Sequence, residues 1–119
     1  MVRSDAEERL TAAAKARLDA LDLYPRPVRT GRVRILHAPW WFRLPILRRF
    51  VGYALGPLIL VKRPLDEISN DLVTHELCHV WQDQNGRTWM WLSYLWQGYR
   101  DNEHEIEARA AVRRTRAVT

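Results

Sequence analysis

The sequence has little cysteine, little lysine and no long uncharged run. The first shortage excludes a disulfide-bonded domain, and the last excludes a membrane-spanning helix. One cysteine, Cys78, cannot form an intramolecular disulfide, and nothing indicates an oxidising compartment. The longest runs without charge, residues 50–61 and 88–99, are well short of the roughly 20 apolar residues that a membrane-spanning helix needs. The first residues lack the apolar stretch of a signal peptide, so we expect a cytoplasmic location.

The positive charge of the chain is nearly all arginine. The formal net charge is +5, and only Lys15 and Lys62 are lysines. The arginines are scattered along the whole chain, which favours a solvated basic surface over a nucleic-acid-binding patch. A basic protein that binds nucleic acid or a membrane surface therefore remains an alternative, but not the leading one.

Size and composition predict one globular domain over residues 1–119. The chain is 47% hydrophobic and 28% charged, with no repeat and no low-complexity segment. Ser4 and Glu7 fit a capping box, and apolar residues then recur at helical spacing. We expect a helix over residues 5–22 that packs against the rest of the domain.

A small mixed or antiparallel sheet is expected within residues 31–62. Alternation in residues 31–37 predicts a half-buried strand. Two further short strands, 50–55 and 58–62, are expected around a Gly-Pro turn. Because Pro57 cannot donate a ladder hydrogen bond, it suits a turn, a bulge or an edge, and we expect the strand 58–62 at an edge of the sheet.

Between the first two strands lies the aromatic run Trp40-Trp41-Phe42, with arginines around it. We interpret it as an irregular loop that packs into the core. The alternative is peripheral membrane contact through Trp40 and Trp41, because mixtures of tryptophan and arginine favour membrane interfaces.

The second half of the chain predicts helices. One should cover residues 66–85, capped by Asp66 and ended by Gly86. Residues 88–99 and 102–116 predict two more, which together form a helical region over 88–116. Helix, strands and then helices in this order define an α+β fold.

The predicted helix 66–85 contains the pattern H-E-x-x-H, formed by His75, Glu76 and His79. Residues four apart lie on one face of a helix, so both imidazoles can bind one zinc ion. From its place beside the first ligand, Glu76 can reach a water on that ion without occupying the metal. Zinc lowers the pKa of such a water toward about 7, and Glu76 would act as the general base.

A catalytic zinc takes a third protein ligand, which should come from a later element. The C-terminal helix offers Glu103, Glu105 and Glu107, and the sequence alone leaves these three open. Cys78 points away from the ligand face and is expected to be a buried structural thiol. His104 is a possible ligand or catalytic donor.

A peptidase also needs a donor for the developing oxyanion. The candidates are Tyr94, Tyr99 and His104, and the sequence does not choose among them. Packing in the core is the simpler role for either tyrosine.

The motif from His75 to Gln82, followed by Tyr99 and by Glu105-Ile106-Glu107-Ala108, resembles the gluzincin branch of the zincin metallopeptidases. More narrowly, it is similar to the small bacterial DUF4157-like domains and to the minigluzincins. The resemblance implies a minimal zincin-like domain in which Glu105, within the pattern E-x-x-A, is the third zinc ligand.

The resemblance also implies that the edge strand 58–62 seats an extended peptide by adding it as a further strand. One departure is Arg109, where several gluzincins carry an acid that orients a ligand histidine. Asp101 and Glu107 are candidates for that orienting role.

The sequence thus predicts a zinc-dependent metallopeptidase that hydrolyses peptide or protein substrates. The expected metal ligands are His75, His79 and, as the resemblance implies, Glu105, and the expected base is Glu76. The first alternative is a catalytically inactive zinc-binding interaction or processing domain, in which the metal serves stability. The oligomeric state is left open.

Overall fold

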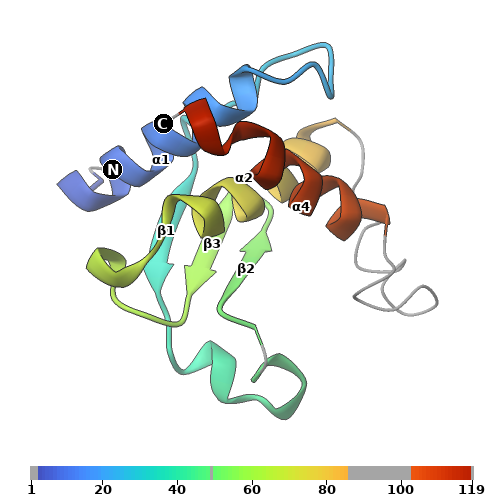
Figure 1. The fold of residues 1–119 in the computed structure, drawn as a ribbon. Coiled ribbons are helices and arrows are strands. Elements are labelled where there is room, and N and C mark those ends of the chain that lie inside the picture. The colour runs from blue at the N-terminus through green and yellow to red at the C-terminus, as the bar shows by residue number, and fades with distance from the viewer. Residues whose placement is uncertain (1–2, 49, 86–102, 119) are drawn as a thin grey trace.

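The computed structural model describes residues 3–48, 50–85 and 103–118, in which three α-helices pack on a three-stranded mixed sheet (Figure 1). This confirms the α+β fold. None of the described helices combines the length and the apolar character needed to cross a bilayer. In chain order the helices and strands are α1 (Asp5–Asp19), β1 (Arg34–His37), β2 (Gly52–Leu55), β3 (Leu58–Val61), α2 (Asn70–Gln84) and α4 (Glu103–Thr115).

The strand order is β1-β3-β2, with β3 parallel to β1 and antiparallel to β2. The prediction that 58–62 forms an edge strand is therefore wrong, because β3 is the central strand. Pro57 lies in the turn before β3, beside Gly56 with its positive φ of 57°, and leaves the ladder intact. The apolar run Leu58–Val61 is typical of a strand covered on both faces.

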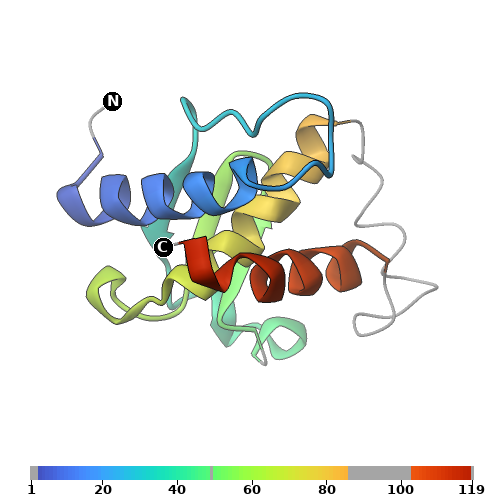
Figure 2. The same cartoon turned by 45° about the horizontal axis from the view of Figure 1, so that its top comes forward.

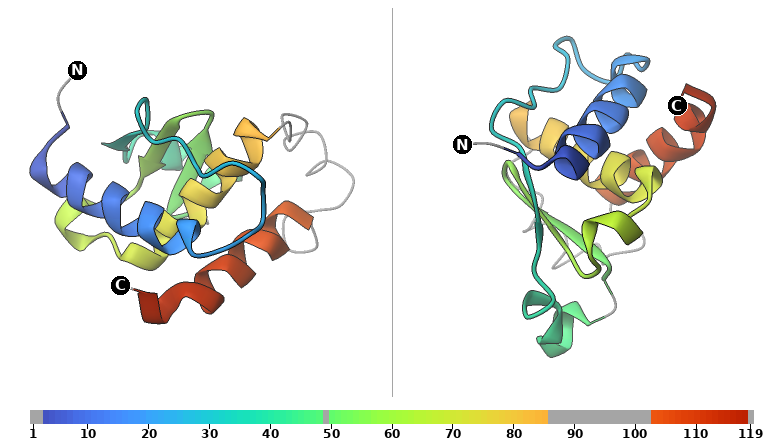
Figure 3. Two further views of the ribbon diagram at one scale, coloured as in Figure 1. Left: turned by 90° about the horizontal axis from the view of Figure 1, so that it is seen from above. Right: turned by 90° about the vertical axis from the view of Figure 1, so that its left-hand side faces the viewer.

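Each face of the sheet packs into its own apolar cluster. Ile35, Ile59 and Val61 point to the helices and are at most 1% exposed. Leu60 points to the other face, where it packs with Phe42 and Ala38 from the segment after β1. The helices lie on one side of the sheet, as the side view shows (Figure 3, right).

The aromatic run after β1 divides between core and surface. It forms a short 3-10 helix, Trp41–Arg43. Phe42 is buried as expected, whereas Trp40 is 62% exposed. The core interpretation therefore holds for Phe42, and Trp40 lies on the surface.

Helix α1 begins as predicted and ends earlier. The Ser4 hydroxyl accepts a hydrogen bond from the amide of Glu7, and the Glu7 carboxylate accepts one from the amide of Ser4. The helix ends at Asp19 rather than at residue 22, because the amide of Ala20 turns back to the carbonyl of Arg17. Such tightening of the last turn is common at helix ends.

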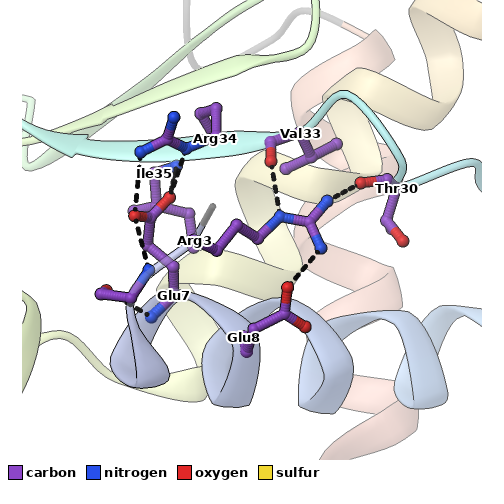
Figure 4. A network of polar contacts seen from close by, with 8 residues as sticks. Arg3, Glu7, Glu8, Thr30, Val33, Arg34 and Ile35 are labelled. Carbon is purple, nitrogen blue, oxygen red and sulfur yellow. Dashed lines mark hydrogen bonds and ion pairs between the residues drawn. The ribbon is translucent and has the colours of Figure 1, made fainter. Parts of the chain in front are cut away.

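Polar contacts tie the start of α1 to β1 (Figure 4). The Glu7 carboxylate accepts hydrogen bonds from the Arg34 guanidinium at 2.8 Å and from the Ile35 amide at 3.2 Å. Arg3 donates to the backbone carbonyls of Val33 and Thr30. These bonds fix α1 along the first strand.

The helix with the H-E-x-x-H pattern, α2, lies between α1 and α4 (Figure 2). Its cap is Ser69, whose hydroxyl accepts from the amide of Leu72, so the prediction of Asp66 as cap was wrong. Asp66 lies instead in the 3-10 turn Leu65–Glu67, and α2 begins only after it. The expected stop at Gly86 lies outside the described residues, and Asn85 forms the C-cap.

Arg17 joins all three helices from inside the molecule. The residue is 1% exposed, and its guanidinium donates to Asp71 of α2, to the carbonyl of Val112 and to the hydroxyl of Thr115 in α4. A buried arginine requires such partners, because an unpaired charge in the interior is very costly. Helix α4 spans Glu103–Thr115 against the predicted 102–116, and the helix predicted over 88–99 lies outside the described residues.

Candidate metal centre

The two histidines of α2 face the same point. They are one turn apart, and their ring centroids are separated by 5.0 Å at an interplanar angle of 78°. The other side of α2 is held in the core by Val73, Leu77 and Val80, each at most 1% exposed. This burial fixes the rotation of the helix and hence the direction of both imidazoles.

Glu105 of α4 completes the group. Its Oε2 lies 2.9 Å from Nε2 of His75, and its Oε1 lies 2.7 Å from Nε2 of His79. The candidate ligand atoms of the three residues all lie within 4.8 Å of one another. The structure thus brings together the three ligands expected from the resemblance. Of the other two candidates, Glu103 is exposed, and Glu107 accepts a hydrogen bond from Gln82 instead.

The donor set fits a divalent metal ion. Two neutral imidazoles and one carboxylate are ligands typical of catalytic zinc, and three protein ligands leave a position open. Nε2 of His79 is buried and, within the described residues, makes no aligned hydrogen bond although Oε1 of Glu105 is 2.7 Å away. Tetrahedral zinc would need these atoms about 3.3 Å apart, a separation of roughly half an ångström more.

Gln82 sets the tautomer of His79. The Nε2 group of Gln82 donates to the carbonyl of His104 at 3.0 Å and to Oε1 of Glu107 at 2.9 Å. Its Oε1 lies 2.8 Å from Nδ1 of His79 and must accept, so His79 carries its proton on Nδ1. Nε2 is then left with the lone pair that a metal requires.

The orienting group behind His79 is therefore Gln82, which was not among the predicted candidates. Glu107 acts further out, since it holds Gln82 and also accepts a hydrogen bond from the Tyr24 hydroxyl at 2.6 Å. Asp101 lies outside the described residues. The spacing of three residues from His79 was the available signal, because positions i and i+3 are neighbours on a helix.

The charges around the site favour a cation. Burial would raise the pKa of Glu105, but the close imidazoles of His75 and His79 outweigh this and hold the pKa below its ordinary value. Burial likewise opposes a charge on His79, yet the carboxylates of Glu105 and Glu76 raise its pKa to about 9. The buried carboxylates of Glu76 and Glu105 are thus stabilised by a positive charge close to them, either a proton or a metal ion.

Glu76 lies next to the ligands in a tight position. It is 5% exposed, and burial raises its pKa above the ordinary value. A Cβ atom at Gly52, the first residue of β2, would lie 3.2 Å from Oε2 of Glu76 and 3.1 Å from Cδ1 of Leu72. Strand β2 therefore passes so close to α2 that only glycine fits without displacing the carboxylate.

An open cleft of about 1000 Å³ leads to His75 and Glu76. Its floor is one face of α2, and the beginning of β2 and one face of α4 form its two sides. The lining residues are Phe50, Val51, Gly52, Asp71, Leu72, His75, Glu76, Arg109, Val112, Arg113 and Arg116. The cleft gives a substrate direct access to the proposed base and to one metal ligand.

The remaining candidate residues are not brought to the cleft by the described part of the chain. His104 is buried and does not line the cleft; its Nε2 lies 3.8 Å from Glu103. Tyr94 and Tyr99 lie outside the described residues. Cys78 is fully buried, and burial raises the pKa of its thiol, which agrees with a structural role.

Comparison of this chain with family models, with curated proteins and with solved structures found no match. The assignment of function consequently depends on the geometry of the site and on the sequence pattern.

Proposed function

We propose that this protein is a zinc-dependent hydrolase of the gluzincin type that cleaves peptide bonds. The observation that supports it best is the convergence of His75, His79 and Glu105 on one point, with Glu76 beside them at the inner end of an open cleft. A site that held zinc only for structure would normally have four protein ligands and no such access.

Each residue then has a distinct role. His75, His79 and Glu105 would hold the ion, which would act as a Lewis acid toward a water and a substrate carbonyl. Glu76 takes the proton from the attacking water and returns it to the leaving amine. Gln82 keeps His79 in the tautomer that leaves Nε2 unprotonated. None of the described residues that line the cleft is assigned to the oxyanion, and Tyr99 and His104 remain predictions for that role.

The strand that seats the peptide is β2 in this proposal. Strand β3 is paired on both sides and has no free ladder positions. Strand β2 is paired only on its β3 side within the described residues, and its first residue lines the cleft. An extended peptide added along β2 would lie directly over Glu76.

The decisive experiment measures metal content and cleavage together. We expect about one zinc per chain by elemental mass spectrometry after purification without added metal. His79→Ala and Glu105→Ala should abolish or strongly weaken retention, whereas Glu103→Ala, on the same helix but exposed, should leave it unchanged. Glu76→Gln should keep the zinc and lose cleavage of a broad peptide library.

Equal cleavage by wild type and Glu76→Gln would refute the peptidase proposal. Retention of zinc by both, with no cleavage by either, would favour the non-catalytic zinc domain. In that case removal of the metal should lower the unfolding temperature markedly, because the metal would then serve stability.

The surface around Trp40 supports a second candidate function, contact with an anionic membrane. Trp40 and Leu44 are 62% and 49% exposed, with exposed Arg43 and Arg48 beside them. Residues 23–65 contain nine arginines and lysines and no acidic residue. Tryptophan and arginine together favour the interface of anionic bilayers.

Vesicles of phosphatidylcholine with phosphatidylglycerol at low salt test this candidate. We expect sedimentation with the vesicles, reduced by Trp40→Ala and by high salt. The matched control is Ile106→Ala, since Ile106 is also exposed, at 52%, but lies on α4. No binding at low salt would refute the membrane function.

A further inference from the structure

The side of the cleft formed by α4 is basic. Four residues at helical spacing line the cleft here: Arg109, Val112 and Arg113 of α4, and Arg116 in the 3-10 turn that follows it. The opposite side, at Phe50 and Val51, carries no charge. A substrate in the cleft would therefore have an apolar neighbour on one side and guanidinium groups on the other.

The acidic residues of the cleft leave Arg113 without a counter-charge. Asp71 is held by Arg17 at 2.8 Å and by Arg116 at 3.1 Å, so its single charge is already shared between two cations. Glu76 is buried beside the metal ligands. Arg113 is exposed and has no ion-pair partner within the described part of the chain. The charge of Arg113 is thus available to a ligand.

We propose that this basic side selects peptides that carry a carboxylate a few residues from the scissile bond. The inference rests on the proposed function, because it names the class of substrate for the same site. Arginine fits the role, since its planar guanidinium binds a carboxylate through two parallel hydrogen bonds. The carboxylate comes either from an aspartate or glutamate side chain or from the C-terminus of the peptide.

The helix geometry limits the distance of that carboxylate from the cleaved bond. Arg113 follows the ligand Glu105 by eight residues, which is about 12 Å along α4 at 1.5 Å per residue. An extended peptide advances about 3.3 Å per residue, so 12 Å is spanned by at most about four residues. We therefore expect the acidic group within about four residues of the cleaved bond, on one side of it only.

Matched peptides test this preference. Quenched fluorescent peptides would carry glutamate or glutamine at successive positions on either side of the scissile bond, each with a free or an amidated C-terminus. A preference for glutamate over glutamine identifies an internal acid, and a preference for the free terminus identifies a terminal carboxylate. One exposed ion pair contributes up to about fivefold in kcat/KM, and we expect a ratio near that value with the wild type.

Arg113→Glu should reverse the preference, and lysine at the same peptide position should then be favoured. The matched control is Arg114→Glu, because Arg114 is exposed on the same helix but does not line the cleft. It makes the same change of net charge and should leave the glutamate-to-glutamine ratio within about twofold. Equal effects of both variants would mean that only the overall charge matters, and would overturn the proposal.

A binding assay separates this inference from the proposed function. In the zinc-loaded Glu76→Gln protein, fluorescence anisotropy of labelled glutamate and glutamine peptides measures recognition without cleavage. Tighter binding of the glutamate peptide, lost in Glu76→Gln/Arg113→Glu, supports the inference even if wild type cleaves nothing. Cleavage by wild type with no charge preference in either assay refutes the inference and leaves the peptidase proposal intact.

Discussion

The Oε1 atom of Gln82 accepts the Nδ1 proton of His79 across 2.8 Å, one helical turn further along α2. Because the amide nitrogen of Gln82 is occupied by Glu107 and by the carbonyl of His104, the amide cannot turn round without losing both bonds. The side chain is completely buried, so no water can replace them. The protein therefore holds the Nδ1 proton of His79 in place, and a metal ion has only to replace a proton at Nε2.

Replacement of Gln82 should weaken metal binding without abolishing it. Gln82→Met keeps the volume and removes the acceptor, and loss of an orienting partner typically lowers metal affinity about 10- to 100-fold. Competition with a chromogenic chelator measures this change. Gln84→Met is the control, since Gln84 lies on the same helix and bonds only to the backbone of Arg29. Unchanged zinc affinity in Gln82→Met would contradict the assigned role.

Addition of a methyl group at Gly52 should impair catalysis and spare the metal. In Gly52→Ala the new Cβ meets the Glu76 carboxylate at 3.2 Å, and Glu76 must shift by a few tenths of an ångström. Because misplacement of catalytic groups is costly, we expect about a tenfold loss in kcat/KM with unchanged zinc content. Gly31→Ala is the control, because nothing lies within 4 Å of a Cβ there. A loss of zinc in Gly52→Ala would place the effect on the ligands instead.

Removal of the Arg17 guanidinium should destabilise the whole domain. Arg17→Met leaves the carbonyl of Val112 without its buried donor and breaks the pair with Asp71. We expect the free energy of unfolding to fall by about 2–4 kcal/mol, measured by urea denaturation. The exposed Arg9 on the same helix provides the control Arg9→Met, for which a change within about 0.5 kcal/mol is expected. A similar small change in Arg17→Met would show that the three-helix junction is dispensable.

The junction of α1 and β1 should make stability fall in acid. The hydrogen bond from Arg34 holds the pKa of Glu7 below its ordinary value of 4.5. A carboxyl whose folded pKa is depressed adds stability above its unfolded pKa, and loses it as the pH falls through the folded value. The stability difference between wild type and Glu7→Gln should therefore be widest near pH 7 and shrink below about pH 4.5. A difference that is constant with pH would exclude the ionised carboxylate as its source.

The thiol of Cys78 should report unfolding. It is fully buried, and burial raises its pKa, so the reactive thiolate is scarce in the folded protein. We expect labelling by an aromatic disulfide reagent to be slow in buffer and complete within the mixing time in concentrated urea. Fast labelling in buffer would show that α2 opens readily from the core.

The sequence was informative wherever one local pattern decided the outcome. The capping box at Ser4 and the placement of His75, Glu76 and His79 on one face depend on neighbours within a turn, and these features agree with the structure. The start of α2 was misplaced, because Asp66 and Ser69 are both good caps and only the packing of the 3-10 turn decides between them.

Features that depend on distant segments could not be predicted in this way. Strand β3 is central because β1, more than 20 residues earlier, lies beside it in parallel, and no local signal encodes that pairing. The role of Gln82 likewise requires Glu107 from another helix. Glu105 was distinguished from Glu103 and Glu107 only by the resemblance, since all three lie on the same helix.

The bonds of Arg17 also bear on the order of folding. They join residues 54, 95 and 98 positions apart in the chain, and contacts of such long range form slowly, because the intervening loop must first be closed. Docking of α4 satisfies the two bonds to Val112 and Thr115, and the same event brings Glu105 to the histidines of α2. We expect a chain with α4 undocked to bind the metal weakly through two imidazoles, and tight metal uptake to mark the last step of its folding.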